Sequence, residues 1–403
     1  MATAAGPGAG RSDVVSAESH PQAGGAPLVS RVSPLELFFD LVFVFALTEV
    51  TGLLAAEISV ANFMRGVAVL MAVWWAWVGF SWLTTARDAE GEWRRLSIVL
   101  AMAAMLVVGI AIPQSFGNDA LVFALGYAAV MVLFVVTYAL SVRDDPEMLR
   151  AVLRLGAGAI VVPVLMIGAA LVGPGLARTA MIVLALLIAY AAPFLAGTMG
   201  WQISPSHFAE RYGLIIIIAL GETVVSIGIG AADEPLGWPI VVGVTLAVLI
   251  VAGMWWLYFD VVARVAEHRL AEVTGLERNA LARDAYTYLH LPMVVGIVFL
   301  ALGLKKALAE PDATLKMLVA LALFGGVALY LLAHVAFRWR SVRSVNFPRS
   351  IVAGMLLACV PLGKVLPALA SVALIAVVVN ALVVYEVVRY RDARARIREA
   401  GRH

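Results

Sequence analysis

Long apolar stretches follow one another along almost the whole chain, and they are the feature that most restricts its fold. About 20 apolar residues in a helix cross the hydrocarbon core of a bilayer. Stretches of roughly this length, bounded by charged residues or by Pro and Gly, are residues 34–57, 62–84, 96–114, 120–141, 151–172, 178–199, 207–230, 237–260, 284–304, 315–336, 350–364 and 368–388. The sequence therefore predicts an all-α, polytopic transmembrane helical bundle of about 12 spans.

The composition agrees with a membrane protein and excludes several other classes. Of the 403 residues, 63% are hydrophobic and 14% are charged, whereas a soluble domain is nearer to about half apolar and about a quarter charged. No gap between the apolar stretches is long enough for a separate globular domain, which excludes a receptor with a large ectodomain and a pump with its own nucleotide domain. Phosphate-binding and hydrolase signatures are absent from the sequence, and we expect no metal, no other cofactor and no nucleic-acid partner.

The two ends of the chain differ from its apolar body. Residues 1–30 are rich in Ala, Gly, Ser and Pro, and we expect a disordered tail there rather than a signal peptide. Residues 391–403 are expected to form a basic cytoplasmic tail. Arginines are concentrated in alternate loops, which by the positive-inside rule predicts a plasma-membrane protein with both termini in the cytoplasm. The expected partners are membrane lipids and a small solute or ion.

Short internal matches predict that the chain consists of two six-span halves, residues 31–199 and 200–390. The matches include residues 46–49 with 219–222 and residues 74–77 with 255–258. Because six is an even number of spans, the two halves would have the same orientation and form a parallel repeat. Transporters often bind their substrate between such repeats.

Two carboxylates open the first apolar stretch. Ser33 and Glu36 have the spacing of a capping box, so one interpretation of Glu36 is that it only caps the helix. Asp40 lies one turn deeper on the same face, where capping no longer explains it. Two carboxylates at this spacing repel each other unless a proton or a cation intervenes, and we therefore expect Asp40 to be functional.

Two further carboxylates lie deep in apolar stretches and correspond to each other in the predicted repeat. Glu49 lies in the first stretch and Glu222 in the seventh. Ionisable groups within a membrane are costly and commonly functional, and we predict that these two carry protons or cations. The alternative is that each forms a hydrogen bond to a neighbouring helix and only stabilises packing.

Other ionisable residues occur near the start of the seventh and ninth stretches. His207, Glu210 and Arg211 share a helix face, which favours either a local ion pair or, with Asp40, a cytoplasmic gate or ion site. His290 precedes Pro292 and is interpreted as either a packing residue or a proton relay. No spacing brings His207, Glu210 and His290 together as a metal site.

Three segments resemble motifs of the bacterial low temperature requirement A family of membrane proteins. They are residues 36–46 (ELFFDLVFVFA), residues 210–214 with 220–222 (ERYGL and LGE), and residues 288–292 (YLHLP). The resemblance extends over about residues 31 to 390 and departs at Tyr212, where Phe is expected. It implies the multi-pass fold and the choice of site residues, Tyr288 among them, rather than a mechanism.

The sequence favours a secondary transporter or an ion- or proton-coupled permease. Two alternatives stay open, namely a membrane-embedded enzyme that acts on a lipid or another hydrophobic small molecule and a structural membrane protein. In the enzyme, the carboxylates and His290 would be the acid and the base. The candidate substrate- or ion-binding residues are Glu36, Asp40, Glu49, His207, Glu210, Arg211, Glu222, Tyr288 and His290.

Overall fold

The computed structural model describes residues 32–86, 91–232 and 237–391, and this part of the chain is helical throughout, with no strand. The predicted disordered tail, 1–30, and residues 392–403 of the predicted basic tail lie outside the described residues. The helices are α1 (Pro34–Ala56), α2 (Val60–Ala86), α3 (Glu92–Ala111), α4 (Ala120–Ser141), α5 (Pro146–Leu171), α6 (Leu176–Ala196), α7 (Pro205–Ala232), α8 (Trp238–Phe259), α9 (Val262–Glu272), α10 (Gly275–Leu281), α11 (His290–Ala309), α12 (Met317–Val342), α13 (Phe347–Cys359) and α14 (Ala368–Arg389). Short 3-10 turns η1 (Ile112–Gln114) and η3 (Val360–Lys364) extend α3 and α13, and a π-helical segment, η2 (Ala282–Tyr288), joins α10 to α11.

The prediction of a helical bundle with about 12 spans is confirmed. Within the described ranges, 12 helical segments are long and apolar enough to cross a membrane, one for each apolar stretch of the sequence. The main differences are in the eighth and ninth segments: the eighth continues to Glu272 rather than ending near residue 260, and the ninth begins at Gly275 rather than near residue 284. Charged residues near the start of the ninth segment pair with each other and with α12, since Asp284 contacts both Arg283 and Arg340 at 2.7 and 2.9 Å. The ninth segment therefore continues beyond its apolar part.

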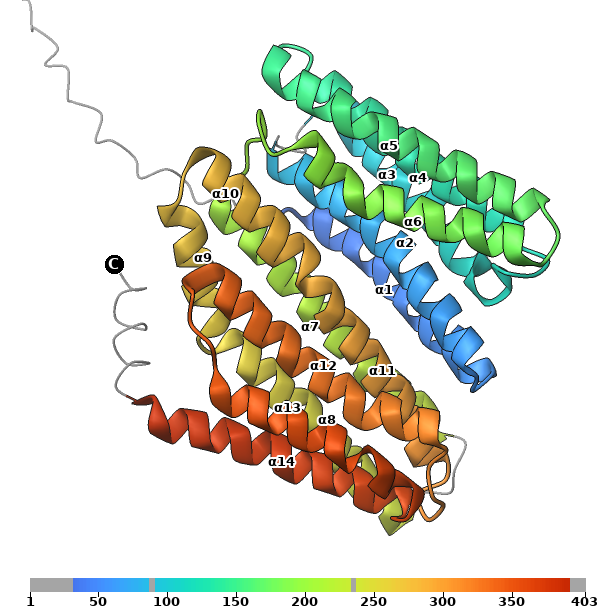
Figure 1. Ribbon diagram of the computed structural model, residues 1–403, viewed down its shortest axis with the longest axis vertical. Coiled ribbons are helices and arrows are strands. Elements are labelled where there is room, and N and C mark those ends of the chain that lie inside the picture. Colours follow the sequence, from blue (N-terminus) through green and yellow to red (C-terminus); the bar gives the residue numbers. More distant parts are fainter. Residues whose placement is uncertain (1–31, 87–90, 233–236, 392–403) are drawn as a thin grey trace, which may run out of the picture.

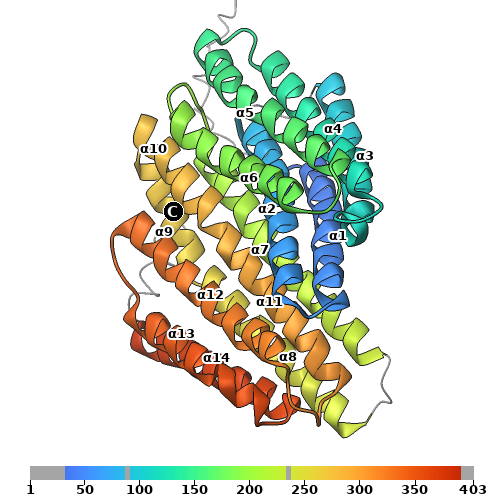
Figure 2. The same ribbon diagram turned by 45° about the vertical axis from the view of Figure 1, so that its right-hand side comes forward.

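Helices α1–α6 and α7–α14 form two neighbouring groups, with α1 and α2 packed against α7 and α11 (Figures 1 and 2). The same helix pairs pack together in both groups. In the first group α1 packs on α3, α3 on α4, α4 on α5, and α2 on α6. In the second group the corresponding pairs are α7 with α11, α11 with α12, α12 with α13, and α8 with α14. This order supports the parallel repeat, which stays a prediction.

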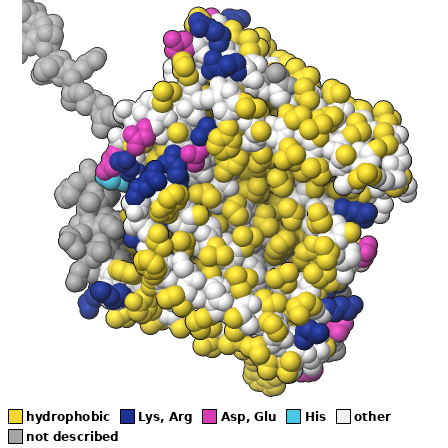
Figure 3. Space-filling view, viewed as in Figure 1, with side chains coloured by type: hydrophobic (Ala, Val, Ile, Leu, Met, Phe, Trp, Pro, Cys, Tyr) yellow, Lys and Arg dark blue, Asp and Glu magenta, His cyan; other side chains and the backbone are white. Residues whose placement is uncertain are grey.

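The surface is that of a protein surrounded by lipid. On the face shown in Figure 3, hydrophobic side chains form a broad belt and charged side chains gather toward the ends of the helices. Inside, glycines allow close approach of α11 and α12, as is common between membrane helices. A Cβ atom added at Gly303 would lie 2.7 Å from the Cα of Leu323, and one added at Gly326 would lie 2.6 Å from the carbonyl oxygen of Gly296.

Candidate functional site

Four ionisable side chains meet where the two helix groups join, and we call Glu36, Asp40, His207 and Arg211 the ionic cluster. The first two come from α1 and the other two from α7. All four are buried, with exposed fractions of 3%, 0%, 4% and 0%. Charges without access to water are expensive unless they pair, so their mutual contacts determine what the cluster can do.

The start of α1 holds Glu36 in place. Ser33 caps the helix, and both halves of the predicted capping box are present. Glu36 Oε2 accepts hydrogen bonds from the backbone N and the Oγ of Ser33, at 2.8 and 2.9 Å. The capping interpretation of Glu36 is therefore correct, but it accounts for only one of the two carboxylate oxygens.

The guanidinium of Arg211 bridges the two carboxylates of α1. Its Nη1 donates to Glu36 Oε1 at 3.0 Å and to Thr84 Oγ1 at 2.9 Å, and its Nη2 donates to Asp40 Oδ1 at 2.7 Å. Asp40 Oδ1 also accepts from the indole nitrogen of Trp77 at 2.8 Å. Repulsion between the two carboxylates is thus offset by one shared cation, which joins α1 to α7.

His207 contacts one residue of α1 and one residue of α2. Its Nδ1 lies 3.2 Å from Thr85 Oγ1, which donates to the carbonyl of Ser81 at 2.7 Å. Its Nε2 lies 3.1 Å from Glu36 Oε2. With both carboxylates ionised and His207 in its imidazolium form, the four charges of the ionic cluster sum to zero, whereas a neutral His207 gives the cluster one excess negative charge.

Two buried polar atoms of the ionic cluster remain unused. Asp40 Oδ2 and Arg211 Nε have no hydrogen-bond partner among the described residues. Such atoms cost free energy in a folded protein and commonly mark functional positions. Asp40 Oδ2 is free to accept a proton, which would neutralise this carboxylate and make the net charge of the cluster more positive by one.

Aromatic side chains pack against the ionic cluster. The Arg211 guanidinium lies 5.7 Å from the ring centre of Trp77, and the rings of Trp77 and Tyr212 are 5.1 Å apart. The Tyr212 hydroxyl forms a 2.9 Å hydrogen bond with Thr287 Oγ1, in the π-helical segment η2. The ionic cluster is therefore connected to η2 through a residue that directly follows Arg211.

Helix α2 also contributes to the ionic cluster, which the sequence does not predict. Trp77, Thr84 and Thr85 supply three hydrogen-bonding groups to the ionic cluster. Hydroxyl residues near a helix end have no pattern that distinguishes them from ordinary polar residues. Trp77 belongs to the segment 74–77 that matches residues 255–258, and only the fold shows that its indole binds a carboxylate.

The structure does not place Glu210 in the ionic cluster. Its side chain is exposed and its Oε2 accepts a hydrogen bond from the backbone N of Val32 at 3.1 Å. Glu210 is one residue before Arg211 in α7, so it points to a different side of the helix.

Glu49 and Glu222 differ in burial. Glu222 is 1% exposed, and its Oε1 accepts a 2.7 Å hydrogen bond from Ser226 on the same helix. Its Oε2 has no partner among the described residues. Glu49 is half-buried. Their role as carriers stays a prediction, and the burial of Glu222 makes it the better candidate of the two.

Tyr288 and His290 flank the junction of η2 and α11. His290 is fully buried, with Nδ1 3.3 Å from the carbonyl of Ala285 and Nε2 2.8 Å from the hydroxyl of Tyr258. Tyr288 donates to the carbonyl of Tyr190. Both ring nitrogens of His290 are thus engaged by protein groups, as the packing interpretation expects. Within the described part of the chain, no three His, Cys, Asp or Glu residues are arranged to hold a metal ion.

The helical architecture and the buried ionic cluster define a multi-pass membrane protein with ionisable groups inside its bundle. The chain belongs to the bacterial low temperature requirement A protein family, whose model matches residues 31–384. It is also 33% identical over 374 residues to an uncharacterized protein of Rhizobium meliloti (strain 1021), which covers 89% of this chain and 90% of the relative. No solved structure matches this chain significantly.

Proposed function

We propose that the protein is a secondary transporter, a proton-coupled permease for a small solute, and that the ionic cluster is its coupling site. The observation that carries this proposal is the burial of Glu36, Asp40, His207 and Arg211 at the junction of the two helix groups. Intramembrane charges that pair across such a junction commonly belong to ion pathways and proton relays. Secondary transporters bind substrates and coupling ions at the corresponding place.

The hydrogen bonds of the cluster provide a way for a proton to change the contact between α1 and α7. Protonation of Asp40 at its unpartnered Oδ2 removes one of the two negative charges that hold Arg211. Loss of one partner of a buried ion pair destabilises the arrangement that contains it by about 3–5 kcal/mol. Because about 1.4 kcal/mol is a tenfold change in an equilibrium, this is enough to shift a helix pair from a closed to an open arrangement.

A small cavity of about 60 Å³ is lined by residues of α2, α4, α5 and α6, by the segment that follows α6, and by Arg283 and Thr287 of η2. We propose it as the position of the solute site, although it would have to widen to reach the usual volume of about 300–1,000 Å³. Thr287 also accepts a hydrogen bond from Trp82 at 3.0 Å and contacts Tyr212, the neighbour of Arg211. In the proposed mechanism, movement of α7 changes this cavity through Tyr212 and Thr287.

The location of the cluster supports the predicted orientation. Up-and-down alternation of the helices places the start of α1, the start of α7 and the arginine-bearing ends of α12 and α14 at one end of the bundle. By the positive-inside rule we propose that this end faces the cytoplasm and that the membrane is the plasma membrane. The ionic cluster would then be a gate on the cytoplasmic side.

The test is a measurement of charge movement in proteoliposomes on a solid-supported membrane. Rapid jumps in pH, in Na⁺ and in K⁺ are applied to the parent protein and to Asp40→Asn and Arg211→Gln. We expect a transient current after the pH jump in the parent and its loss in both variants. The control is Glu277→Gln, which removes one partner of an exposed ion pair with Arg269. A pH-jump current that is equal in Asp40→Asn and the parent would show that the ionic cluster only stabilises packing.

A further inference from the structure

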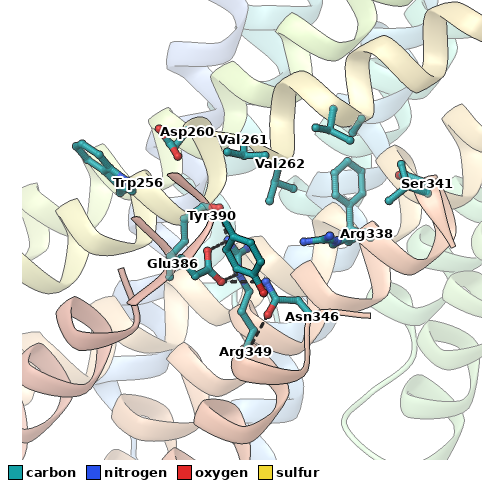
Figure 4. A pocket seen from close by; sticks show the side chains of 15 residues that line it. Trp256, Asp260, Val261, Val262, Arg338, Ser341, Asn346, Arg349, Glu386 and Tyr390 are labelled. Atoms are coloured by element: carbon teal, nitrogen blue, oxygen red, sulfur yellow. Dashed lines mark hydrogen bonds and ion pairs between the residues drawn. The ribbon is translucent and has the colours of Figure 1, made fainter. Parts of the chain in front are cut away.

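A second polar site lies in a cavity of about 300 Å³, which is lined by residues between Trp256 and Tyr390 in the second helix group. The ends of α8, α12 and α14 and the starts of α9 and α13 surround it, and Figure 4 shows the side chains that line it. This volume is at the lower end of the range of about 300–1,000 Å³ that is usual for ligand sites. None of the residues of the ionic cluster lines it.

One wall of this cavity carries hydrogen-bond donors that the protein does not use. Arg338 donates from Nε to Ser344 Oγ at 2.8 Å, and its two terminal nitrogens have no hydrogen-bond partner among the described residues. Figure 4 shows its guanidinium directed toward the cavity centre, and Ser341 lies about one turn further along the same helix. Ser341 is 6% exposed, lines the cavity, and its Oγ has no partner in the described part of the chain. A buried hydroxyl in this state is costly unless a ligand or water pairs with it.

Arg338 is the cation of this cavity that keeps hydrogen-bond donors for a ligand. Glu386 is bound by Arg349 through two contacts, at 2.8 and 2.7 Å, and by Asn346 at 2.9 Å. Arg338 acts on Glu386 electrostatically, but among the described residues its hydrogen bond is to Ser344. Asp260, which has an interaction of its own, lies on the other side of the cavity, next to Trp256 (Figure 4). An anionic group is therefore attracted to Arg338.

The position and the other walls of the cavity indicate an amphiphilic ligand. Val262, Val265 and Phe337 provide apolar surface. The cavity lies where three membrane-crossing helices end, which is the depth at which lipid headgroups meet acyl chains. Arginine pairs well with phosphate oxygens, and basic pockets between helices at this depth are suited to anionic lipid headgroups.

We propose that the cavity is a binding site for an anionic phospholipid, with the phosphate on Arg338 and Ser341 and the glycerol and first acyl carbons against the apolar wall. The proposal does not depend on the transport proposal, because the two sites share no residue. A bound lipid would join α12 to the α8–α9 and α13–α14 ends and stabilise the folded bundle.

The test uses the full-length chain in a neutral detergent and dioctanoyl phosphatidylglycerol as the probe, with binding measured by calorimetric titration. We expect saturable binding by the parent protein. Arg338→Gln should weaken it about tenfold, which is the usual effect of losing one charge-assisted hydrogen bond. The matched control is Arg343→Gln, at an exposed arginine near the same end of α12 that does not line the cavity, and binding there should change by less than about twofold.

A second variant separates lipid binding from folding. Ser341→Ala removes a buried hydroxyl without a partner, so it should raise the unfolding temperature without lipid and reduce the further rise that lipid produces. Equal affinity of the parent and Arg338→Gln for phosphatidylglycerol would overturn the proposal. So would equally tight binding of inorganic phosphate, which would indicate a free anion, or phosphatidylcholine binding as tight as that of phosphatidylglycerol.

Discussion

The buried contact between Asp40 and Arg211 allows a quantitative test of whether the ionic cluster carries full charges. Asp40 Oδ1 and Arg211 Nη2 are 2.7 Å apart, and both residues have an exposed fraction of 0%. Relative to the parent, Asp40→Asn removes one negative charge from the four groups, and Arg211→Gln removes one positive charge. Removal of one partner of a buried pair costs about 3–5 kcal/mol, because the other charge is left in a low dielectric.

The double variant should recover much of this loss. With both residues replaced, Glu36 and His207, which are 3.1 Å apart in the parent, remain as a pair. We therefore expect the loss in the double variant to be smaller than the sum of the two single losses by about 2–3 kcal/mol. If only hydrogen bonds were lost, each single variant would cost about 0.6 kcal/mol and at most about 1.7, since this is the range for hydrogen bonds between membrane helices.

The assay is reversible unfolding in bicelles, with the free energy of unfolding measured for the parent, the two single variants and the double variant. Glu277→Gln serves as the control, because its ion pair with Arg269 is exposed and should contribute about 0–1 kcal/mol. Single losses below about 2 kcal/mol, or losses that add without interaction, would refute the assignment of a charged, mutually neutralising cluster.

Two further predictions concern stability within the bundle. Glu222→Gln should raise the free energy of unfolding by about 1 kcal/mol or more, because a neutral amide takes the place of a buried carboxylate that has one unpartnered oxygen. A lower free energy of unfolding in the same bicelle assay would show that the carboxylate is well paired. Gly326→Ala should lower the free energy of unfolding by about 1–3 kcal/mol, since its Cβ would lie 2.6 Å from the carbonyl oxygen of Gly296. Gly228→Ala, whose Cβ would have no atom within 4 Å, should be neutral or stabilising. Equal melting temperatures for the two variants would contradict this packing argument.

The fold could be predicted to the level of helices because hydropathy decides it. In lipid every backbone polar group needs an internal partner, so each long apolar stretch has to be a helix. The sequence does not predict the structure correctly where a helix continues beyond the apolar stretch, because this constraint no longer applies there. The extension of the ninth segment back to Gly275 is stabilised by Asp284 and two arginines, which are contacts between segments that hydropathy does not contain. The π-helical form of residues 282–288 likewise has no signal in the apolar pattern.

The candidate site could be predicted in part for a related reason. An ionisable residue within an apolar stretch is conspicuous, and for this reason the sequence alone predicts Asp40 and Arg211 as candidate site residues. Which of these residues meet depends on helix packing, and so the sequence could not separate Arg211, inside the cluster, from Glu210, outside it. Residues of ordinary type that complete the site, such as Thr84 and Thr85, become visible only through their contacts.

The net charge of the ionic cluster decides how a movement of the proposed gate would respond to voltage. Electric work on a moving element is proportional to the net charge that it carries through the field, at about 2.3 kcal/mol per elementary charge per 100 mV. With both carboxylates ionised and His207 in its imidazolium form, the four side chains carry no net charge, and the field exerts no net force on them as a unit. Protonation of Asp40 adds one positive charge to this unit. Movement of the proposed gate would then become sensitive to the membrane potential only after Asp40 has taken up a proton.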